Sequence, residues 1–155
     1  MGGTTLAVLN PFTAERAEAV VVEEMIAEGL TRCAPDSEYW YSADGLPYGY
    51  SLDFPHEEFD LRAVERTAGT GMRSEILLHI FTSDIAGRPA LGRMAQRVAE
   101  RAGGWVFVEF RTPPSADLLH CLETAGRLIR VDGAVYLDGP AMAAWNAHPD
   151  FHVVK

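Results

Sequence analysis

Cysteines and long apolar runs are scarce in this sequence of 155 residues. Its two cysteines, Cys33 and Cys121, are too few for a disulfide framework and lack the CxxC spacing of metal and redox sites. We therefore expect both to be reduced thiols, buried as small hydrophobic side chains. No apolar run approaches the roughly 20 residues of a membrane-spanning helix, and no Lys or Arg precedes the apolar residues 6–9 as in a signal peptide. These features predict a cytoplasmic protein that does not interact with a membrane.

The common catalytic motifs are missing as well. The sequence contains no GxSxG, no HExxH and no paired CxxC. Its Gly/Thr stretches, residues 2–4 and 69–71, lack the lysine of a P-loop and the full dinucleotide fingerprint, which favours ordinary loops. We therefore predict no catalytic residue, no cofactor and no metal site.

Basic residues are nearly absent from the first 61 residues of a chain whose net charge is -9. Twelve acidic residues lie there against Arg16 and Arg32, and residues 36–60 contain seven carboxylates with no Lys or Arg. A surface of this charge repels phosphate backbones, so nucleic acid is excluded as a partner. A protein with a basic surface is the partner that the charge favours.

The composition indicates one folded domain covering residues 1–155. A hydrophobic fraction of 48% is typical of a globular protein, and a chain of this length can bury a real core. Strand and helix patterns both occur along it. We therefore expect an α+β domain with a mixed β-sheet and about four helices packed on it.

Strands are predicted where short apolar or aromatic runs lie between turn residues, at 4–9, 38–42, 48–54, 74–81, 105–110, 128–131, 134–137 and 151–154. Helices are predicted at 13 to about 31 or 33, 56–67, 89–102, 116–126 and 139–147. Residues 56–67 also alternate like a strand, although a helix is the favoured interpretation.

Several of these elements carry sharper expectations. Residues 74–81 and 105–110 should be central strands, apolar on both faces, joined by the helix between them in a right-handed βαβ crossover. Asp132-Gly133 predicts a hairpin with a type I′ turn. In the first helix, with Thr13 as N-cap, the three glutamates that lie off the apolar stripe should face water; these are Glu23, Glu24 and Glu28.

Three groups of residues have the composition of chemical sites. A cluster that could bind a divalent metal or transfer protons comprises Asp53, His56, Glu57, Glu58 and Asp60. Its spacing matches no known ligand pattern, and a solvated charged face is the simpler interpretation. His148 and His152 would share one face of a helix, but Pro149 favours a terminal strand. His120 and Cys121 are neighbours, which point about 100° apart on a helix and cannot readily share a proton.

The acidic and aromatic segment 36–60 is the predicted partner-binding site. Tyrosine and tryptophan bury large areas with few rotatable bonds, and carboxylates around them complement a basic partner. The proposed contact residues are Tyr39, Trp40, Tyr41, Asp44, Tyr48, Tyr50, Asp53, Glu57, Glu58 and Asp60. The alternative is that these aromatic side chains fill the core and the carboxylates only keep the protein in solution.

Two stretches resemble a known group of proteins: residues 91–110 (LGRMAQRVAERAGGWVFVEF) and residues 144–155 (AWNAHPDFHVVK). They resemble small bacterial proteins, chiefly actinobacterial, that are similar to immunity proteins of polymorphic toxin systems. The resemblance covers about a fifth of the chain. It implies an acidic, cytosolic α+β domain that occludes the active site of a toxin, and it assigns a role to no residue.

These observations predict an immunity-like inhibitor that binds a toxin through its acidic aromatic face. Two alternatives stay open. One is a small metal-dependent hydrolase that uses carboxylates and histidines within residues 53–79, and the other is an acidic secretion chaperone. The oligomeric state does not follow from the sequence.

Overall fold

The computed structural model describes residues 3–55, 59–82 and 85–154. Its strands are β1 (Thr4–Asn10), β2 (Thr31–Arg32), β3 (Trp40–Tyr41), β4 (Pro47–Asp53), β5 (Ser74–Ile80), β6 (Trp105–Glu109), β7 (Leu128–Val131) and β8 (Ala134–Leu137). Its helices are α1 (Ala14–Ala27), α2 (Phe59–Ala68), α3 (Arg88–Ala102), α4 (Ala116–Ala125) and α5 (Gly139–Ala147), with a 3-10 turn η1 (Ile85–Gly87) before α3. The α+β class is confirmed.

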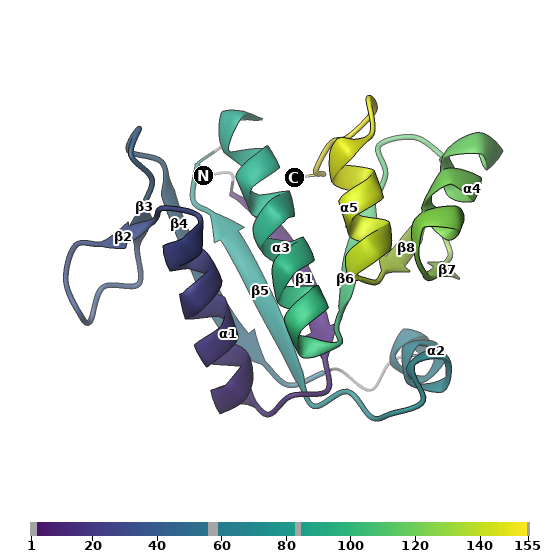
Figure 1. Cartoon of the computed structure of the whole chain (residues 1–155), viewed down its shortest axis with the longest axis horizontal. Coiled ribbons are helices and arrows are strands. Elements are labelled where there is room, and N and C mark those ends of the chain that lie inside the picture. Colours follow the sequence, from purple (N-terminus) through teal and green to yellow (C-terminus); the bar gives the residue numbers. More distant parts are fainter. Residues whose placement is uncertain (1–2, 56–58, 83–84, 155) are drawn as a thin grey trace.

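All eight strands form one sheet in the order β2-β3-β4-β5-β1-β6-β8-β7. β5 and β6 both run antiparallel to β1, which lies between them, so they are parallel to each other. The unit β5–α3–β6 is therefore a crossover connection, but it passes over β1 instead of joining neighbouring strands (Figure 1). Every neighbouring pair of strands in the described sheet is antiparallel.

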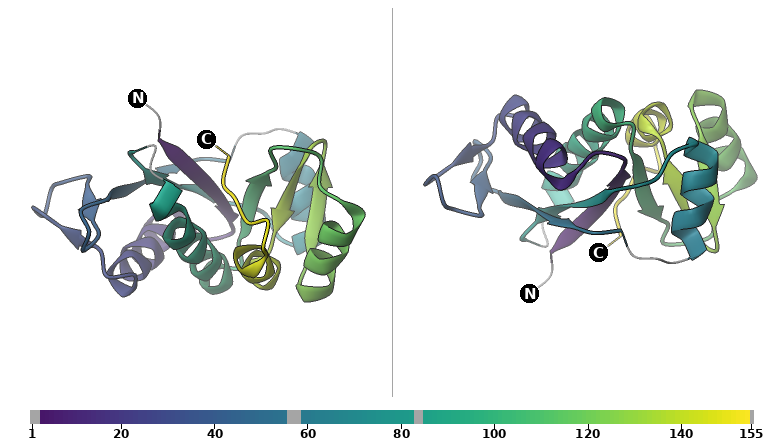
Figure 2. Two further views of the ribbon diagram at one scale, coloured as in Figure 1. Left: turned by 90° about the horizontal axis from the view of Figure 1, so that it is seen from above. Right: turned by 90° about the horizontal axis from the view of Figure 1, so that it is seen from below.

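The two faces of the sheet are covered unequally. α1, α3, α4 and α5 pack on one face and form the main core with alternate residues of the strands, such as Leu6 and Val8 of β1 (Figure 2). α2 packs against one end of the opposite face, where Val64 meets Leu9 and Trp105. The rest of this second face has no helix on it in the described part of the chain. We call it the open face.

Local signals in the sequence positioned most elements correctly. Thr13 caps α1, since its hydroxyl accepts a hydrogen bond from Arg16 N, and Gly103 ends α3 in the left-handed conformation with φ 66°. The β7–β8 hairpin is confirmed. Of its two loop residues only Asp132 has a positive φ (48°), so the predicted type I′ turn, which needs two, is wrong.

The first helix ends earlier than predicted. Gly29 adopts a positive φ of 89°, and Leu30 N donates to Met25 O, which closes the helix after Ala27. The chain then enters β2, where Thr31 pairs with Tyr41. Leu30 is buried as the apolar stripe required, but it reaches the core from the turn and not from a longer helix.

The expectation that the glutamates of α1 face water is wrong for two of them. Glu24 is buried (8% exposed), and Glu28 keeps only 11% of its side chain exposed. Both pair with arginines of α3, which lies beside α1. Arg97 bonds Glu24 (2.5 Å) and Glu28 (2.8 Å) at once. The charged stripes of two helices therefore neutralise each other at their interface.

Two further expectations are wrong. Residues 151–154 form no strand: Val153 is buried in the main core, and its carbonyl accepts a hydrogen bond from Arg88, so the segment packs through side chains without a ladder partner. Cys33 and Cys121 are exposed free thiols. Cys33 lies in the loop after β2, and Cys121 lies on an exposed part of α4. The helical interpretation of residues 56–67 is confirmed from Phe59 onward, and residues 56–58 lie outside the described chain.

Candidate functional site

The open face is the part of the sheet that no helix covers in the described chain. Strand residues alternate between the faces, and those opposite the main core point to the open face. On the central strands they are Thr5, Ala7, Ser51, Asp53, Glu75, Leu77, His79, Phe107, Glu109, Ala134 and Tyr136. Their exposure classes are intermediate or exposed, whereas the alternate residues on the helix side are mostly buried.

The charged residues at the exposed strand positions of this face are all acidic. Asp53 lies opposite Glu75 on the neighbouring strand, and Glu109 lies at the far end of β6. No Lys or Arg occupies any of the described strand positions of the open face. The middle is apolar, because Ala7 pairs with both Leu77 and Phe107, and the rings of Phe107 and Tyr136 lie 5.2 Å apart. The open face therefore has an apolar centre and acidic ends.

Aromatic side chains form a corner at the edge of this face. Tyr39 and Phe81 are 40% and 38% exposed, and their rings meet edge to face at 5.1 Å. Phe81 also stacks on the His79 ring at 5.5 Å, and Tyr41 lies 6.5 Å from Tyr39. Gly49 makes this packing possible, since a Cβ there would come within 2.6 Å of the Phe81 ring. We call Tyr39, Tyr41, His79 and Phe81 the aromatic corner.

His79 is held between two hydroxyl groups. Its Nδ1 lies 3.0 Å from Thr5 Oγ1, and its Nε2 lies 3.0 Å from Ser51 Oγ. Burial lowers the pKa of His79 below its usual 6.5, so the ring is neutral at pH 7. A neutral imidazole with one nitrogen facing a serine hydroxyl has the arrangement of a general base beside a nucleophile.

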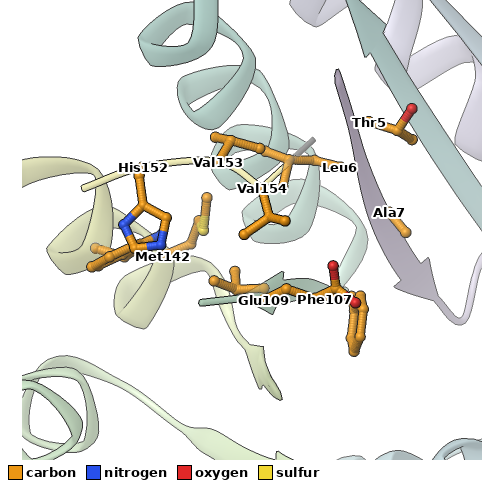
Figure 3. A pocket seen from close by; sticks show the side chains of 11 residues that line it. Thr5, Leu6, Ala7, Phe107, Glu109, Met142, His152, Val153 and Val154 are labelled. Atoms are coloured by element: carbon orange, nitrogen blue, oxygen red, sulfur yellow. The ribbon is translucent and has the colours of Figure 1, made fainter. Parts of the chain in front are cut away.

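A cleft of about 220 Å³ opens where β1 and β6 separate (Figure 3). The two strands pair only over Ala7–Leu9 and Trp105–Phe107, and the end of the chain, with His152, Val153 and Val154, enters the gap beyond. His152 Nδ1 lies 2.8 Å from Asp150 O, and Nε2 accepts a hydrogen bond from Arg111 N. Both ring nitrogens therefore contact the backbone, which leaves His152 a structural role in this cleft.

The predicted partner-binding residues are divided between core and surface. Trp40 (5% exposed) and Tyr48 (2%) are buried, and Tyr48 OH donates to Gly87 O. Neither side chain can reach a partner in this fold. Tyr50 lies on the helix side of β4, where its hydroxyl donates to Glu18 (2.7 Å). The core-filling alternative thus describes these residues well.

The remaining predicted residues lie apart from one another. Tyr39 and Tyr41 belong to the aromatic corner, and Asp53 lies on the open face. Asp44 is exposed in the β3–β4 loop and accepts a hydrogen bond from Ser42. Asp60 is half-buried near the start of α2 and lines a shallow hollow with Phe107 and Glu109. Glu57 and Glu58 lie outside the described residues.

Other pairs considered in the sequence do not form chemical sites. His148 and His152 both contact the Trp145 ring, at 5.9 and 5.2 Å, from a segment that is not helical. His120 and Cys121 are exposed neighbours on α4. In residues 3–55, 59–82 and 85–154, no three His, Cys, Asp or Glu side chains are close enough to bind a metal ion.

Sequence reasoning missed most of the open face. Glu75, Phe107 and Glu109 are absent from the predicted site, because strands 74–81 and 105–110 are predicted to be apolar on both faces. The signal that could have revealed them is the period of two in SEILLHI, which places Glu75, Leu77 and His79 on one side. Their location beside Asp53 and Ser51 depends on the strand order, which no local pattern reports.

Comparison with known protein families, curated proteins and solved structures finds no match to this chain. None of the helices in the described residues has the length and apolar character needed to cross a membrane.

Proposed function

We propose that this protein binds a partner protein with a basic surface through the open face and the aromatic corner, and that it acts as an immunity-like inhibitor of that partner. The single observation that carries the proposal is the composition of the open face: an apolar centre, carboxylates at Asp53, Glu75 and Glu109, and no Lys or Arg at its strand positions.

Physical chemistry supports binding by such a face. Exposed aromatic rings such as Tyr39 and Phe81 are efficient anchors, since they bury much area and lose little conformational entropy. Carboxylates at the ends of the face attract a basic partner and speed its encounter. Arg93, Arg97 and Arg101 of α3 lie on the opposite side of the sheet, where they pair with glutamates of α1 and its C-terminal end. The acidic field of the open face is therefore not cancelled by them.

The test compares two sets of charge changes. The first variant carries Asp53→Asn, Glu75→Gln and Glu109→Gln, and the matched control carries Glu100→Gln, Asp117→Asn and Glu123→Gln on exposed sites of α3 and α4. Each protein is used to capture partners from its source organism at low salt. The activity of the captured partner is then measured while increasing amounts of each protein are added. We expect the first variant to lose at least about tenfold in affinity and inhibition, and the control to match the wild type.

Two results would contradict the proposal. One is a partner that binds both variants equally. The other is a captured partner that keeps its full activity when the wild-type protein saturates it. That result would show binding without inhibition.

The contact between Ser51 and His79 supports a second candidate, an esterase-type hydrolase. In that reaction Ser51 Oγ would attack an ester carbonyl while His79 Nε2 takes its proton, the alcohol would leave, and water would release the acid. Labelling with a fluorophosphonate, located by mass spectrometry, separates the two functions. An adduct at Ser51 that is lost in His79→Ala but kept in Ser42→Ala would favour the hydrolase, and an unlabelled protein would exclude it.

A further inference from the structure

Within the described residues, part of the outer edge of β4 has no neighbouring strand. Ser42 N donates to Leu46 O on the β3 side, whereas Phe81 N donates to Pro47 O on the β5 side. Successive residues of an antiparallel strand direct their N–H and C=O groups to opposite sides. The main-chain groups of Tyr50 and Leu52, which follow Leu46 in steps of two, therefore point away from β5.

β3 covers only the first part of this edge. Trp40 pairs with Tyr48, and the pairing ends there. Continuing the same register would bring residues 38 and 36 opposite Tyr50 and Leu52, but Ser37 N donates to Ala34 O and the chain turns away. No backbone hydrogen bond joins the outer side of Tyr50 or Leu52 to another described segment. Such an edge is a template for an added strand.

Carboxylates lie on both sides of the free edge. Glu18 of α1 accepts a hydrogen bond from Tyr50 OH, and Glu15 lies one helical turn before it on the same side of α1. Asp53 lies on the open face at the end of β4. A cation also lies near Tyr50: Arg32, whose guanidinium donates to Pro35 O and lies over the Trp40 ring.

We infer that the outer edge of β4, at Tyr50 and Leu52, accepts an extended basic segment of the partner protein as an additional strand. The inference rests on the proposed function, because it states how part of the basic partner is held. Main-chain hydrogen bonds hold such a strand, and its alternate side chains select it. Basic side chains on its two faces would meet Glu18 on one side and Asp53 on the other. A second copy of this chain fits poorly, since it would bring the same carboxylates together.

The experiment measures amide hydrogen exchange by NMR on the full chain. The probe is a short peptide that repeats Lys-Lys-Val-Val, which places Lys on both faces of a strand. It is compared with a peptide that repeats Glu-Glu-Val-Val and with the basic peptide methylated on alternate backbone nitrogens. We expect the basic peptide to slow exchange of the Tyr50 and Leu52 amides by about tenfold or more, as new ladder hydrogen bonds require. The methylated and acidic peptides should leave both rates unchanged.

Variants at Leu52 supply the matched control. Leu52→Pro removes one outward N–H, whereas Leu52→Ala keeps it and loses the same packing. We expect Leu52→Pro to bind the basic peptide about tenfold more weakly than Leu52→Ala. If the NMR spectrum shows that the proline variant does not fold, the exchange rates of the wild-type protein test the inference.

The possible negative results can be distinguished from one another. If the basic peptide binds but the two amides exchange as fast as before, the edge is not the site, while recognition of a basic partner survives. If basic and acidic peptides bind equally well or neither binds, the proposed function fails together with this inference. A dimer whose Tyr50 and Leu52 amides are already protected without peptide would show that a second copy occupies the edge, which overturns the inference.

Discussion

Arg97 Nε of α3 lies 2.5 Å from Glu24 Oε2 of α1, in the interface between the two helices that cover one end of the sheet. Glu24 is only 8% exposed, so its charge depends on this partner and on Arg101, whose Nη1 lies 3.1 Å from Glu24 Oε1. The pair shows how the acidic first helix is tolerated: its carboxylates are neutralised by a neighbour that is distant in the sequence.

Removing Arg97 should destabilise the fold. Arg97→Ala leaves Glu24 buried with one of its two arginine partners and releases Glu28 from one contact. We expect the free energy of unfolding to fall by about 1–3 kcal/mol, because a buried charge loses a hydrogen bond. Urea denaturation checks this. Arg130→Ala, which breaks the exposed pair with Glu123, should change the value by less than about 1 kcal/mol. Equal losses in both variants would show that the α1–α3 pairs contribute no more than surface pairs.

The same interface should make stability depend on pH. Burial alone would raise the pKa of Glu28, but hydrogen bonds and charge from Arg93 and Arg97 outweigh it, so the pKa lies below the usual 4.5. A carboxylate with a lowered pKa stabilises the fold above its unfolded value and loses that contribution as the pH falls through its folded value. Between about pH 5 and about pH 3, we expect the Tm of Glu28→Gln to fall less steeply than that of the wild type. Parallel curves would contradict this assignment.

A methyl group at Gly49 should disturb the aromatic corner. A Cβ there would lie 2.6 Å from the Phe81 ring and 2.9 Å from Glu38 O, and the backbone oxygen cannot move away easily. Gly49→Ala should therefore cost about 1–3 kcal/mol in the free energy of unfolding and shift the NMR signals of the His79 ring that Phe81 covers. Gly133→Ala, where a Cβ meets nothing within 4 Å, is the control. An unshifted His79 spectrum in Gly49→Ala would be inconsistent with the stack.

Tyr50 offers a test of the α1–β4 contact. Burial, together with the hydrogen bond and the negative charge of Glu18, raises the pKa of Tyr50 from 10.0 to about 12. Glu18→Gln removes the charge, so the pKa of Tyr50 should fall toward 10.0. Absorbance titration of tyrosinate, with Tyr50→Phe to assign the step, measures the change. No difference between wild type and Glu18→Gln would show that the two side chains do not interact in solution.

The sequence predicted the elements better than it predicted their environments. Thr13, Gly103 and the Asp132-Gly133 pair act on neighbouring residues, so their signals could be interpreted without knowing the fold. The candidate site was predicted only in part. Tyr39 and Asp53 are exposed and Tyr41 is half-buried, whereas Trp40 and Tyr48 are in the core. The identity of an aromatic residue in a strand does not indicate which face of the sheet it occupies.

What the sequence determined alone is local: the α+β class, most helix and strand positions, and the concentration of negative charge before residue 62. Tertiary structure decided where that charge lies. Glu24 and Glu28 turn toward the arginines of α3, while Asp53 meets Glu75 on the open face. The physical reason is that strand order and helix packing join residues far apart in the chain, and burial and pairing depend on those neighbours rather than on the residues beside them in sequence.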